Sequence, residues 1–507
     1  MRKFFKTVAI VTVFSISEKF LGFLYRIYLS RTIGSQGIGI YQVALSVFAL
    51  LLTICSSGTP ITVSRLMTKY RAEGKSENAK KIISAGITLT LGIALPLCAV
   101  FFIFSSSFNF IFADQRCMKI FLIVLPGLVF TSVYSVLRGV FWGDKDFLPY
   151  SIIELLEEIC MIVVGIILIN SATDVFDGAV RAGVAVLVSY IFSFSLATAV
   201  FFFRKHRLSN PFGQFKPLLS SAMPITAMRT ANSLTVSLVS IILPMRLMVA
   251  GFSNNQVMAS FGAAMGQAIP LLFIPTTLIG SFTLVLVPEI SENFYKKQTY
   301  YLKRDVEKSL KFATFLTCLF IPVFAVCGQE IGILVFDSHE CGTYLTASSF
   351  LMLFMSLSNI TTSMLNSMGL ENKTLVYFII GGVIMLFCIW FLPSVCGIYS
   401  LLVGFTAIYG LTTLLNLILL NKNCKEKPRY LKFMLCASAL LIPTLLFGFM
   451  LEKILVSFLG SFLTLLVCGS AMAVFNALLY FGFNLLSAKL IFSKLKLNFK
   501  KKKTAVR

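Results

Sequence analysis

The chain has 507 residues, of which 57% are hydrophobic and only 13% are charged, with a formal net charge of +23. Soluble domains carry about 25% charged residues, so this chain has too few charges to cover a water-facing surface. The composition excludes an ordinary soluble protein and indicates an all-α integral membrane protein, whose length is counted in bilayer spans of about 20 residues.

The residues that carry most enzyme and metal chemistry are sparse. The 12 cysteines are scattered without a C-x-x-C pair, and there are only 2 histidines. This spacing matches neither a disulfide framework nor a zinc site, and the chain has no Walker loop and no G-x-S-x-G motif. We therefore expect no metal, no cofactor and no enzymatic bond-making.

Apolar segments follow one another along most of the chain. The N-terminal segment "MRKFFKTVAIVTVF" lacks a small-residue cleavage site, so we interpret it as part of a first span and not as a signal peptide. A window of about 20 residues predicts fourteen spans. They lie near residues 7–30, 38–66, 82–106, 118–142, 149–170, 178–203, 217–245, 257–287, 309–330, 344–367, 374–392, 396–420, 432–450 and 461–486. The segments at 118–142 and 344–367 are the weakest, because polar residues interrupt them.

Loop charge predicts the orientation. With the N-terminus inside, the two tails and the inside loops hold about three quarters of the 44 Lys and Arg residues. The outside loops hold six, namely Arg31, Arg116, Lys119, Arg181, Arg246 and Lys453. Because cytoplasmic loops collect Lys and Arg, we expect a multi-pass protein of the cell membrane with both termini in the cytoplasm. The basic tail, residues 491–507, is expected against anionic lipid headgroups, since it lacks the interleaved aromatics of a nucleic-acid-binding segment.

Three landmarks share an offset of 228 residues: Pro60 with Pro288, Leu137 with Leu365, and Lys145 with Lys373. Repeated halves are common in transporters. We therefore expect two six-helix lobes around a central cavity, and two extra C-terminal helices. The predicted boundaries are 1–205, 206–425 and 426–490, followed by the tail.

The first span carries Glu18, Lys19 and Arg26, which together would cost roughly 8 to 10 kcal/mol if they faced lipid. They should therefore face a wet cavity or one another. Lys19 and Arg26 are seven residues apart, hence on one helix face and about 10 Å apart along the axis. They could jointly hold an extended anion, while Glu18 pairs with another helix. Arg229, deep in the seventh span, is a candidate companion across the cavity.

Other charges have competing explanations. Arg65 and Arg138 lie near the cytoplasmic ends of their spans, where they either join the substrate site or reach the headgroups; Arg26 could likewise reach outer headgroups. For Lys19 and Arg229 the competing explanation is a structural ion pair. Three glutamates of the fifth span, Glu154, Glu157 and Glu158, are expected to be structural carboxylates that favour the helix dipole in its first turns.

Three segments carry a resemblance to a known family: "EKFLGFLYRIYLSRTIGSQGIGIYQ", "SSGTPITVSRLMTKYRAEG" and "LRGVFWGDKDFLP". They resemble the stage V sporulation protein B group of lipid-linked polysaccharide flippases, in the superfamily that also contains multidrug (MATE) exporters and the lipid II flippase. The resemblance covers most of the chain and is strongest over residues 18–150. It implies export of an undecaprenyl-linked peptidoglycan precursor for the spore cortex, a cavity between two lobes, and a lipid-tail groove beside the last two helices.

The resemblance also implies where a pyrophosphate is held. Lipid II flippases place arginines in spans one, two and eight. Matched on the glycines at 22 and 34, the first of these falls on Lys19, the second falls near Leu52, and the third has no counterpart. The substrate site is therefore expected to differ in detail, since lysine lacks the bidentate grip of guanidinium. The candidate substrate-binding residues are Lys19, Arg26, Arg65, Arg138, Arg229 and Glu18.

Two alternatives remain open. A MATE-type multidrug antiporter would carry a flat cation and need an unpaired intramembrane carboxylate for Na⁺ or H⁺, for which Glu18 is the deep candidate. A non-transporting scaffold that recruits cell-wall synthesis enzymes is the third. The expected partners are a lipid-linked glycan and membrane lipids, with cell-wall enzymes as further candidates.

Overall fold

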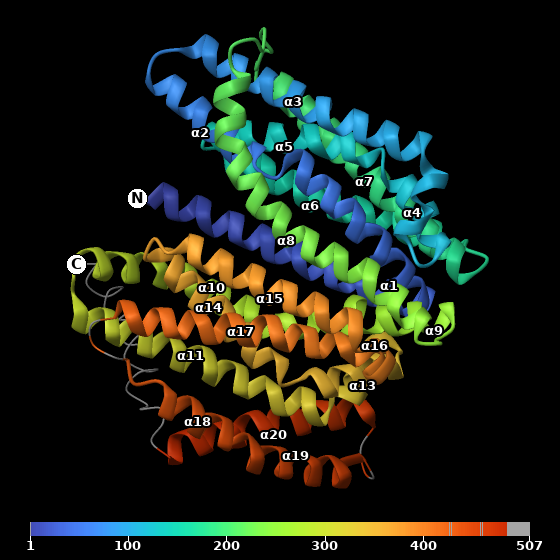
Figure 1. Ribbon diagram of the computed structural model, residues 1–507, viewed down its shortest axis with the longest axis vertical. Coiled ribbons are helices and arrows are strands. Elements are labelled where there is room, and N and C mark those ends of the chain that lie inside the picture. Colours follow the sequence, from blue (N-terminus) through green and yellow to red (C-terminus); the bar gives the residue numbers. More distant parts are fainter. Residues whose placement is uncertain (1, 425, 427, 457, 459, 484–507) are drawn as a thin grey trace. The chain divides into compact units, whose positions relative to one another are not determined.

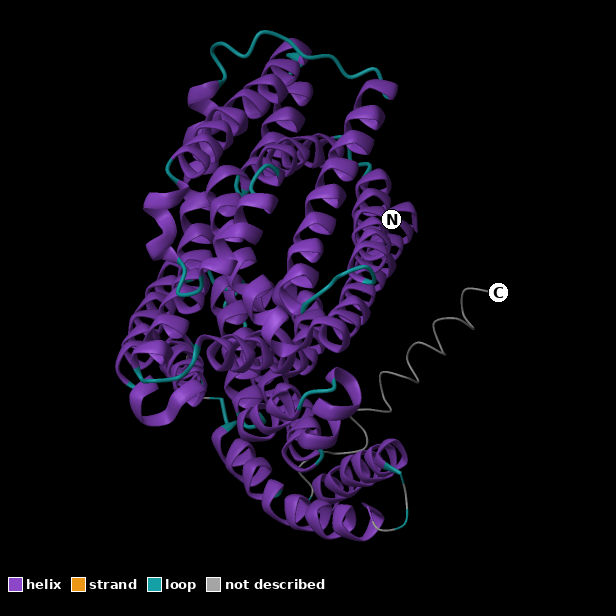
Figure 2. Ribbon diagram, turned by 90° about the vertical axis from the view of Figure 1, so that its right-hand side faces the viewer, coloured by secondary structure: helices purple, strands orange, loops and turns teal. Residues whose placement is uncertain are grey.

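The computed structural model describes residues 2–424, 426, 428–456, 458 and 460–483. Within these ranges every regular element is a helix (Figure 2), which confirms the all-α class. The predicted basic tail, residues 491–507, lies outside the described residues.

The chain divides into two compact units (Figure 1). The first comprises Met1–Gln267 and Ile389–Ser400. Its elements are α1 (Arg2–Ser56), α2 (Thr59–Ala72), α3 (Ser76–Ile103), η1 (Ser105–Ile111), α4 (Gln115–Val124), α5 (Gly127–Gly143), α6 (Phe147–Ile169), α7 (Val175–Phe203), α8 (Phe215–Val249), α9 (Asn254–Phe261), the π-helix η2 (Gly262–Ala268) at its boundary, α16 (Pro393–Cys396) and η3 (Gly397–Tyr399).

The second unit comprises Ala268–Cys388 and Leu401–Arg507. Its helices are α10 (Ile269–Tyr295), α11 (Thr299–Val326), α12 (Gly328–Phe336), α13 (His339–Ser348), α14 (Leu351–Ser367), α15 (Glu371–Phe391), α17 (Ser400–Asn423), α18 (Leu431–Ala439), α19 (Leu441–Val456) and α20 (Ser461–Gly482). The additional helices α18, α19 and α20 pack against α11.

Ten segments of the described chain are long and apolar enough to cross a membrane, or up to 12 if each of two bent helix pairs counts as one span. The first of them, Val13–Ala72, has 60 residues. A helix of that length measures about 90 Å, three times the hydrocarbon thickness, so it cannot be a single crossing. The number fourteen remains a prediction.

A kink divides this long segment at Gly34. Its backbone angles are φ 65° and ψ 177°, a region that is essentially closed to residues with a Cβ. Glycine therefore allows α1 to change direction between its two arms without strain. The predicted boundary between spans one and two, at residues 30–38, contains this residue.

Both units contain a bent helix pair. In the first, Gln115–Val124 and Gly127–Gly143 meet at 45°; in the second, His339–Ser348 and Leu351–Ser367 meet at 59°. Each of the four boundaries in the second pair lies 224 residues after its counterpart in the first. The two segments that the sequence marks as weakest are these bent pairs, and they are repeats of one another.

The repeat offset of 228 predicted from three landmarks is wrong by one helical turn. Lys145, in the turn after α5, has φ 59°, and the residue with positive φ after α14 is Gly369, at φ 78°. These two positions are 224 residues apart, whereas Lys373 already lies inside α15. The shared lysines misled the alignment because a turn conformation, not a side chain, is what repeats.

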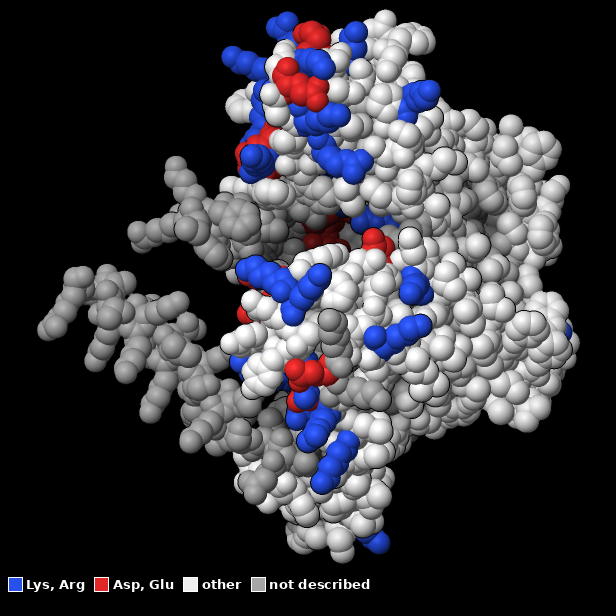
Figure 3. All heavy atoms as spheres, turned by 60° about the vertical axis from the view of Figure 1, so that its left-hand side comes forward, with Lys and Arg blue, Asp and Glu red and all other residues white. Residues whose placement is uncertain are grey.

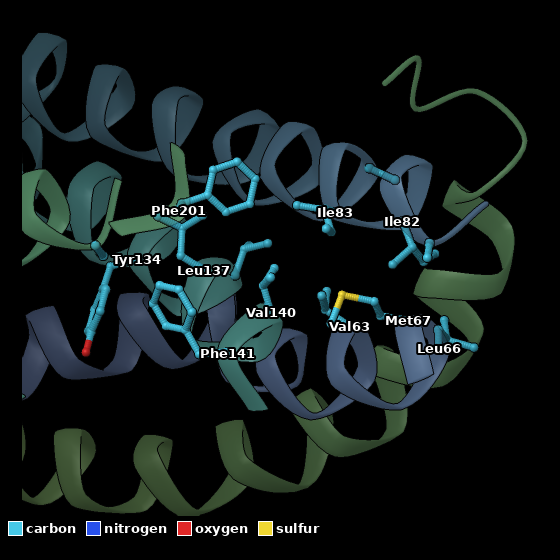
Figure 4. Packing of buried hydrophobic residues seen from close by; sticks show 14 of the residues in the cluster. Val63, Leu66, Met67, Ile82, Ile83, Tyr134, Leu137, Val140, Phe141 and Phe201 are labelled. Carbon is cyan, nitrogen blue, oxygen red and sulfur yellow. The ribbon is translucent and has the colours of Figure 1, made fainter. Parts of the chain in front are cut away.

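Each unit has an apolar core between corresponding helices. In the first, α2, α3 and α5 contribute most of the cluster drawn in Figure 4, including Met67, Ile82 and Phe141. In the second, α10, α11 and α14 form the equivalent cluster. Tyr134 lies at the edge of the first cluster, and Figure 4 shows its oxygen directed away from the labelled apolar side chains.

The loops predicted to be cytoplasmic meet at one end of the first unit. Arg71 after α2 and His206 after α7 both bond to Asp144 after α5. Arg204 donates to Asp146 in the same turn. Figure 3 shows such charged side chains gathered in a strip, beside broad areas of surface that carry none. Uncharged areas of this kind suit hydrocarbon contact.

Residues predicted to lie outside meet elsewhere in the same unit. Gln36 and Arg116 both donate to Oδ1 of Asn255, at 2.8 and 3.0 Å. Lys119 lies over the ring of Phe176. The predicted inside and outside loops therefore form two separate groups, although the structure carries no membrane to say which group is cytoplasmic.

Candidate functional site

One face of α1 presents Lys19, Gly22 and Arg26, because residues three and four apart on a helix are neighbours. The side chain of Lys19 is exposed and that of Arg26 is half-buried. α6 packs against α1. A Cβ placed on Gly22 would lie 2.8 Å from Oε1 of Glu158, so this carboxylate rests directly on the α1 backbone. The predicted pair of cations shares one face, and that face carries an acidic neighbour.

Arg26 is held from the other side by a π-helix. Its Nη1 donates to the carbonyl oxygen of Gly266 at 2.8 Å. The π-helix Gly262–Ala268 interrupts the regular hydrogen-bond pattern, and such interruptions often leave a carbonyl available to a side chain. Arg26 therefore takes part in the α1–η2 contact and does not reach freely for headgroups.

The glutamates of α6 are not in its first turn. The helix begins at Phe147, with Asp146 at the N-cap, so Glu154, Glu157 and Glu158 lie two to three turns inside it. A helix dipole acts only within the first turn or so, and the dipole explanation for these carboxylates is therefore wrong. All three are half-buried.

Arg138 and Glu154 form an ion pair between α5 and α6. Nη1 of Arg138 donates to Oε1 of Glu154 at 3.2 Å, and the two side chains are 27% and 20% exposed. The guanidinium also lies over the rings of Trp142 and Tyr150, at 5.4 and 5.9 Å. Its position is thus set by four groups, and it braces α5 against α6.

Glu18 lies on α1 near this ion pair. It is half-buried and within electrostatic reach of Glu154, Lys19 and Arg138. No ion pair of Glu18 appears among the described residues. The expectation that it pairs with another helix is met only at this longer range.

Two hydroxyl groups border the α6 carboxylates. Tyr134 is 4% exposed, its hydroxyl has no hydrogen-bond partner, and it interacts electrostatically with Glu154 and Glu157. Ser193 on α7 lies within hydrogen-bond range of Glu157. Glu157 therefore faces α5 and α7, whereas Glu158, the next residue, faces α1.

Arg65 and Arg229 lie at a different contact, where α8 crosses the break between α1 and α2. Arg65 donates to the hydroxyl of Ser221 at 2.7 Å, and Arg229 donates to the carbonyl of Ser57 at 3.0 Å. Both side chains are exposed. The Ser57 carbonyl follows the end of α1, where backbone oxygens lack intrahelical partners, so Arg229 caps the broken turn.

The structure therefore collects Glu18, Lys19, Arg26 and Arg138 around the α1–α6 contact and places the other two arginines beside α8. Sequence reasoning missed Glu158. The available signal was Gly22, which lies between the two cations at helical spacing and leaves room for a side chain from another helix. Among the described residues, no group of three or more His, Cys, Asp or Glu side chains could hold a metal ion.

A family model described as "Polysaccharide biosynthesis protein" matches residues 4–294, which is more than half of the chain. The chain belongs to this family. The match includes the whole α1–α6 contact and every candidate substrate-binding residue.

Two proteins of Bacillus subtilis (strain 168) are similar to this member of the polysaccharide biosynthesis family. Stage V sporulation protein B is 24% identical over 398 residues, which cover 75% of this chain and 76% of the relative. Lipid II flippase MurJ is 23% identical over 428 residues, covering 76% of each chain. The predicted resemblance to the stage V sporulation protein B group is confirmed.

Solved structures share the fold. The inward closed conformation of a lipid II flippase MurJ superposes with a TM-score of 0.71 at 16% identity and covers 94% of this chain and 99% of that one. An inward-facing multidrug MATE transporter gives 0.65 at 13% identity, covering 80% and 93%. Together with its many apolar helices, this fold identifies the chain as a multi-pass membrane protein of the transporter type.

Proposed function

We propose that this protein moves an undecaprenyl-pyrophosphate-linked peptidoglycan precursor, or a related lipid-linked polysaccharide, across the cytoplasmic membrane, in the service of spore cortex synthesis. The observation that carries the proposal is the shared face of Lys19 and Arg26 on α1, inside a membrane protein of this family. The names of the two Bacillus relatives support the substrate class and the sporulation role.

In this proposal Lys19 and Arg26 hold the pyrophosphate. Charge-assisted hydrogen bonds from ammonium and guanidinium to phosphate oxygens are among the strongest available, and they offset the cost of keeping these cations in the membrane. Arg138 braces the site through its pair with Glu154, with Glu18 beside it. Arg65 and Arg229 line the path of the anion further along. No bond is made or broken, so the protein acts as a transporter and not as an enzyme.

The proposed architecture retains fourteen spans with both termini in the cytoplasm. Residues 1–205 and 206–425 form two lobes, residues 426–490 provide the groove for the lipid tail, and residues 491–507 lie against anionic headgroups. Cell-wall synthesis enzymes are proposed partners, because they make and consume such precursors. The repeated bent pairs support two related halves.

A MATE-type cation-coupled multidrug antiporter is the second candidate. The fold shared with a MATE transporter and the glutamates inside α6 favour it. The coverage weighs against it, since the MATE superposition leaves a fifth of this chain unmatched whereas the flippase superposition matches 94%.

Transport by purified protein in proteoliposomes tests the proposal. Lipid II, a polyprenyl phosphate sugar and a flat drug cation would be offered separately, and their transfer to the opposite leaflet or lumen measured. We expect transfer of lipid II above that of protein-free vesicles. Transfer of the drug cation alone, driven by a Na⁺ or H⁺ gradient, would replace this proposal with the antiporter.

A further inference from the structure

We infer that Glu158 is an internal anion of the candidate site: its carboxylate occupies the place between Lys19 and Arg26 and makes the site selective for multiply charged diphosphates over singly charged phospholipid headgroups. This inference rests on the proposed function, because it takes the two cations to be the pyrophosphate-binding groups.

The spacing on α1 is the first step. Gly22 follows Lys19 by three residues and precedes Arg26 by four, so all three lie on one face, and Gly22 is the middle one. With Oε1 of Glu158 2.8 Å from where a Cβ of Gly22 would be, the carboxylate lies between the two cations along the helix. Any larger residue at position 22 would displace it.

Electrostatics is the second step. Glu158 interacts with Arg26 and Lys19 as attracting charges and with Glu18 as a repelling one. None of these contacts is an ion pair within the described residues, so the carboxylate is shared between the cations and not locked to one of them. It lowers the cost of two unpaired cations in the membrane while the site is empty.

The donors that remain are the third step. The Nη1 atom of Arg26 donates to Gly266, and a guanidinium has five N–H donors, so several stay available. The ammonium of Lys19 belongs to an exposed side chain and can follow a ligand. A diphosphate therefore finds donors on both sides of Glu158.

Selectivity follows from the competition. Anionic phospholipids are abundant in a bacterial membrane, and each presents a phosphodiester with a single charge. Such a headgroup gains little by replacing a carboxylate of equal charge that is already in place. A diphosphate carries at least two charges over a longer span, so it gains enough to displace Glu158.

The test compares full-length wild-type protein with Glu158→Gln in phosphatidylcholine nanodiscs, using farnesyl pyrophosphate as the diphosphate probe and phosphatidylglycerol as the singly charged competitor. We expect Glu158→Gln to bind farnesyl pyrophosphate at least about fivefold more tightly, since one unit charge 4 Å away is worth about that factor even in bulk water. Phosphatidylglycerol should compete with the probe in the variant and hardly at all in the wild type.

Glu157→Gln is the matched control, because it removes the same charge from the next residue of α6, which faces α5 and α7. Its affinity for the probe should change by less than the Glu158→Gln affinity does. Glu158→Asp keeps the charge and withdraws it from Gly22, so it should give an intermediate affinity, and it substitutes for Glu158→Gln if that variant does not fold.

The failures are distinguishable. If Lys19→Ala weakens probe binding while Glu158→Gln leaves it unchanged or weaker, the internal-anion role is overturned and the proposed function stands. Equal tightening by Glu157→Gln and Glu158→Gln would also overturn it, since position would then be irrelevant. If the wild type and both glutamine variants bind no diphosphate, the proposed function fails and takes the inference with it.

Discussion

Lys19 is the residue whose chemistry separates the competing explanations for charge in the first span. It is exposed on the α1 face, and no ion pair holds it among the described residues. A lysine with a structural partner would leave that partner unpaired when removed, which strongly destabilises a protein. A lysine that waits for substrate leaves only water behind.

We therefore expect Lys19→Ala to lower export by at least about tenfold while membrane-inserted protein stays near the wild-type level. Lys19→Arg should retain substantial activity, because guanidinium also binds phosphate and often does so bidentately. The measurement is export activity divided by the amount of inserted protein. Normal export by Lys19→Ala would show that this charge is tolerated for reasons unrelated to substrate.

Arg138 is the opposite case at the same scale. Its ion pair with Glu154 and the rings of Trp142 and Tyr150 fix the guanidinium within the α5–α6 contact. A cation held by so many groups is poorly placed to move with a substrate. Its contribution to the site is to set the position of α6, and thereby of the glutamates that α6 carries.

The second arm of α1 shows how elements are held together in the first unit. A Cβ on Gly39 would lie 1.9 Å from the carbonyl oxygen of Met258, and one on Gly262 would lie 1.9 Å from that of Ser35. Such distances mean backbone against backbone. In membranes, where helices gain no hydrophobic energy by association, small residues allow this close packing.

Gly39→Ala should therefore separate α1 from α9 and η2 and destabilise the protein by about 1 to 3 kcal/mol, as overpacking typically does. Gly92→Ala is the control, because a Cβ there meets nothing within 4 Å. Thermal unfolding in detergent should show a lower midpoint for Gly39→Ala and little change for Gly92→Ala. Equal midpoints would refute the close-packing account.

Asp144 joins the loops at one end of the first unit, outside the spans. Burial raises the pKa of its carboxyl group, but hydrogen bonds from His206 and Arg71 and their charges lower it further, and the net pKa lies below the ordinary value. A lowered pKa in the folded state stabilises the protein at any pH above the unfolded value, near 3.9, and this stabilisation is lost as pH falls through the folded pKa.

Asp144→Asn should accordingly cost about 1 to 3 kcal/mol of stability at pH 7, the range for hydrogen bonds to charged groups. The difference from wild type should shrink as pH falls below about 4. Thermal unfolding of both proteins across this pH range measures it. A difference that stays constant down to pH 3 would mean that the side-chain shape, and not its charge, matters.

At the scale of the whole molecule, composition was enough for the fold class, since a chain with so few charges has to place its helices in hydrocarbon. The weak segments at 118–142 and 344–367 were found for a physical reason: polar residues interrupt them, and both are bent in the structure. The sequence also located the kink near Gly34, because loop residues there separate two apolar runs.

The sequence could not show which helices meet. The resting place of Glu158 on Gly22 depends on α6 packing against α1, a contact between residues more than a hundred positions apart. The repeat offset was missed for a related reason, since matching lysines are cheap coincidences whereas the matching turns are visible only in backbone angles. Residues of the cation pair were predicted, because a single helix sets their spacing.

Orientation is the prediction that joins all of these levels. Within the first unit the loops predicted inside are bonded to one another around Asp144, and those predicted outside meet at Asn255. The positive charge of the first group favours the cytoplasm. Cysteines at the exposed positions Ser76 and Gln298 should then be shielded from an impermeant thiol reagent in intact cells, whereas cysteines at Ser171 and His339 should be labelled. The background must lack reactive native thiols, and permeabilised cells should label all four positions. Labelling at Ser76 in sealed cells would reverse the first unit, and labelling at Gln298 alone would remove one span between the two positions.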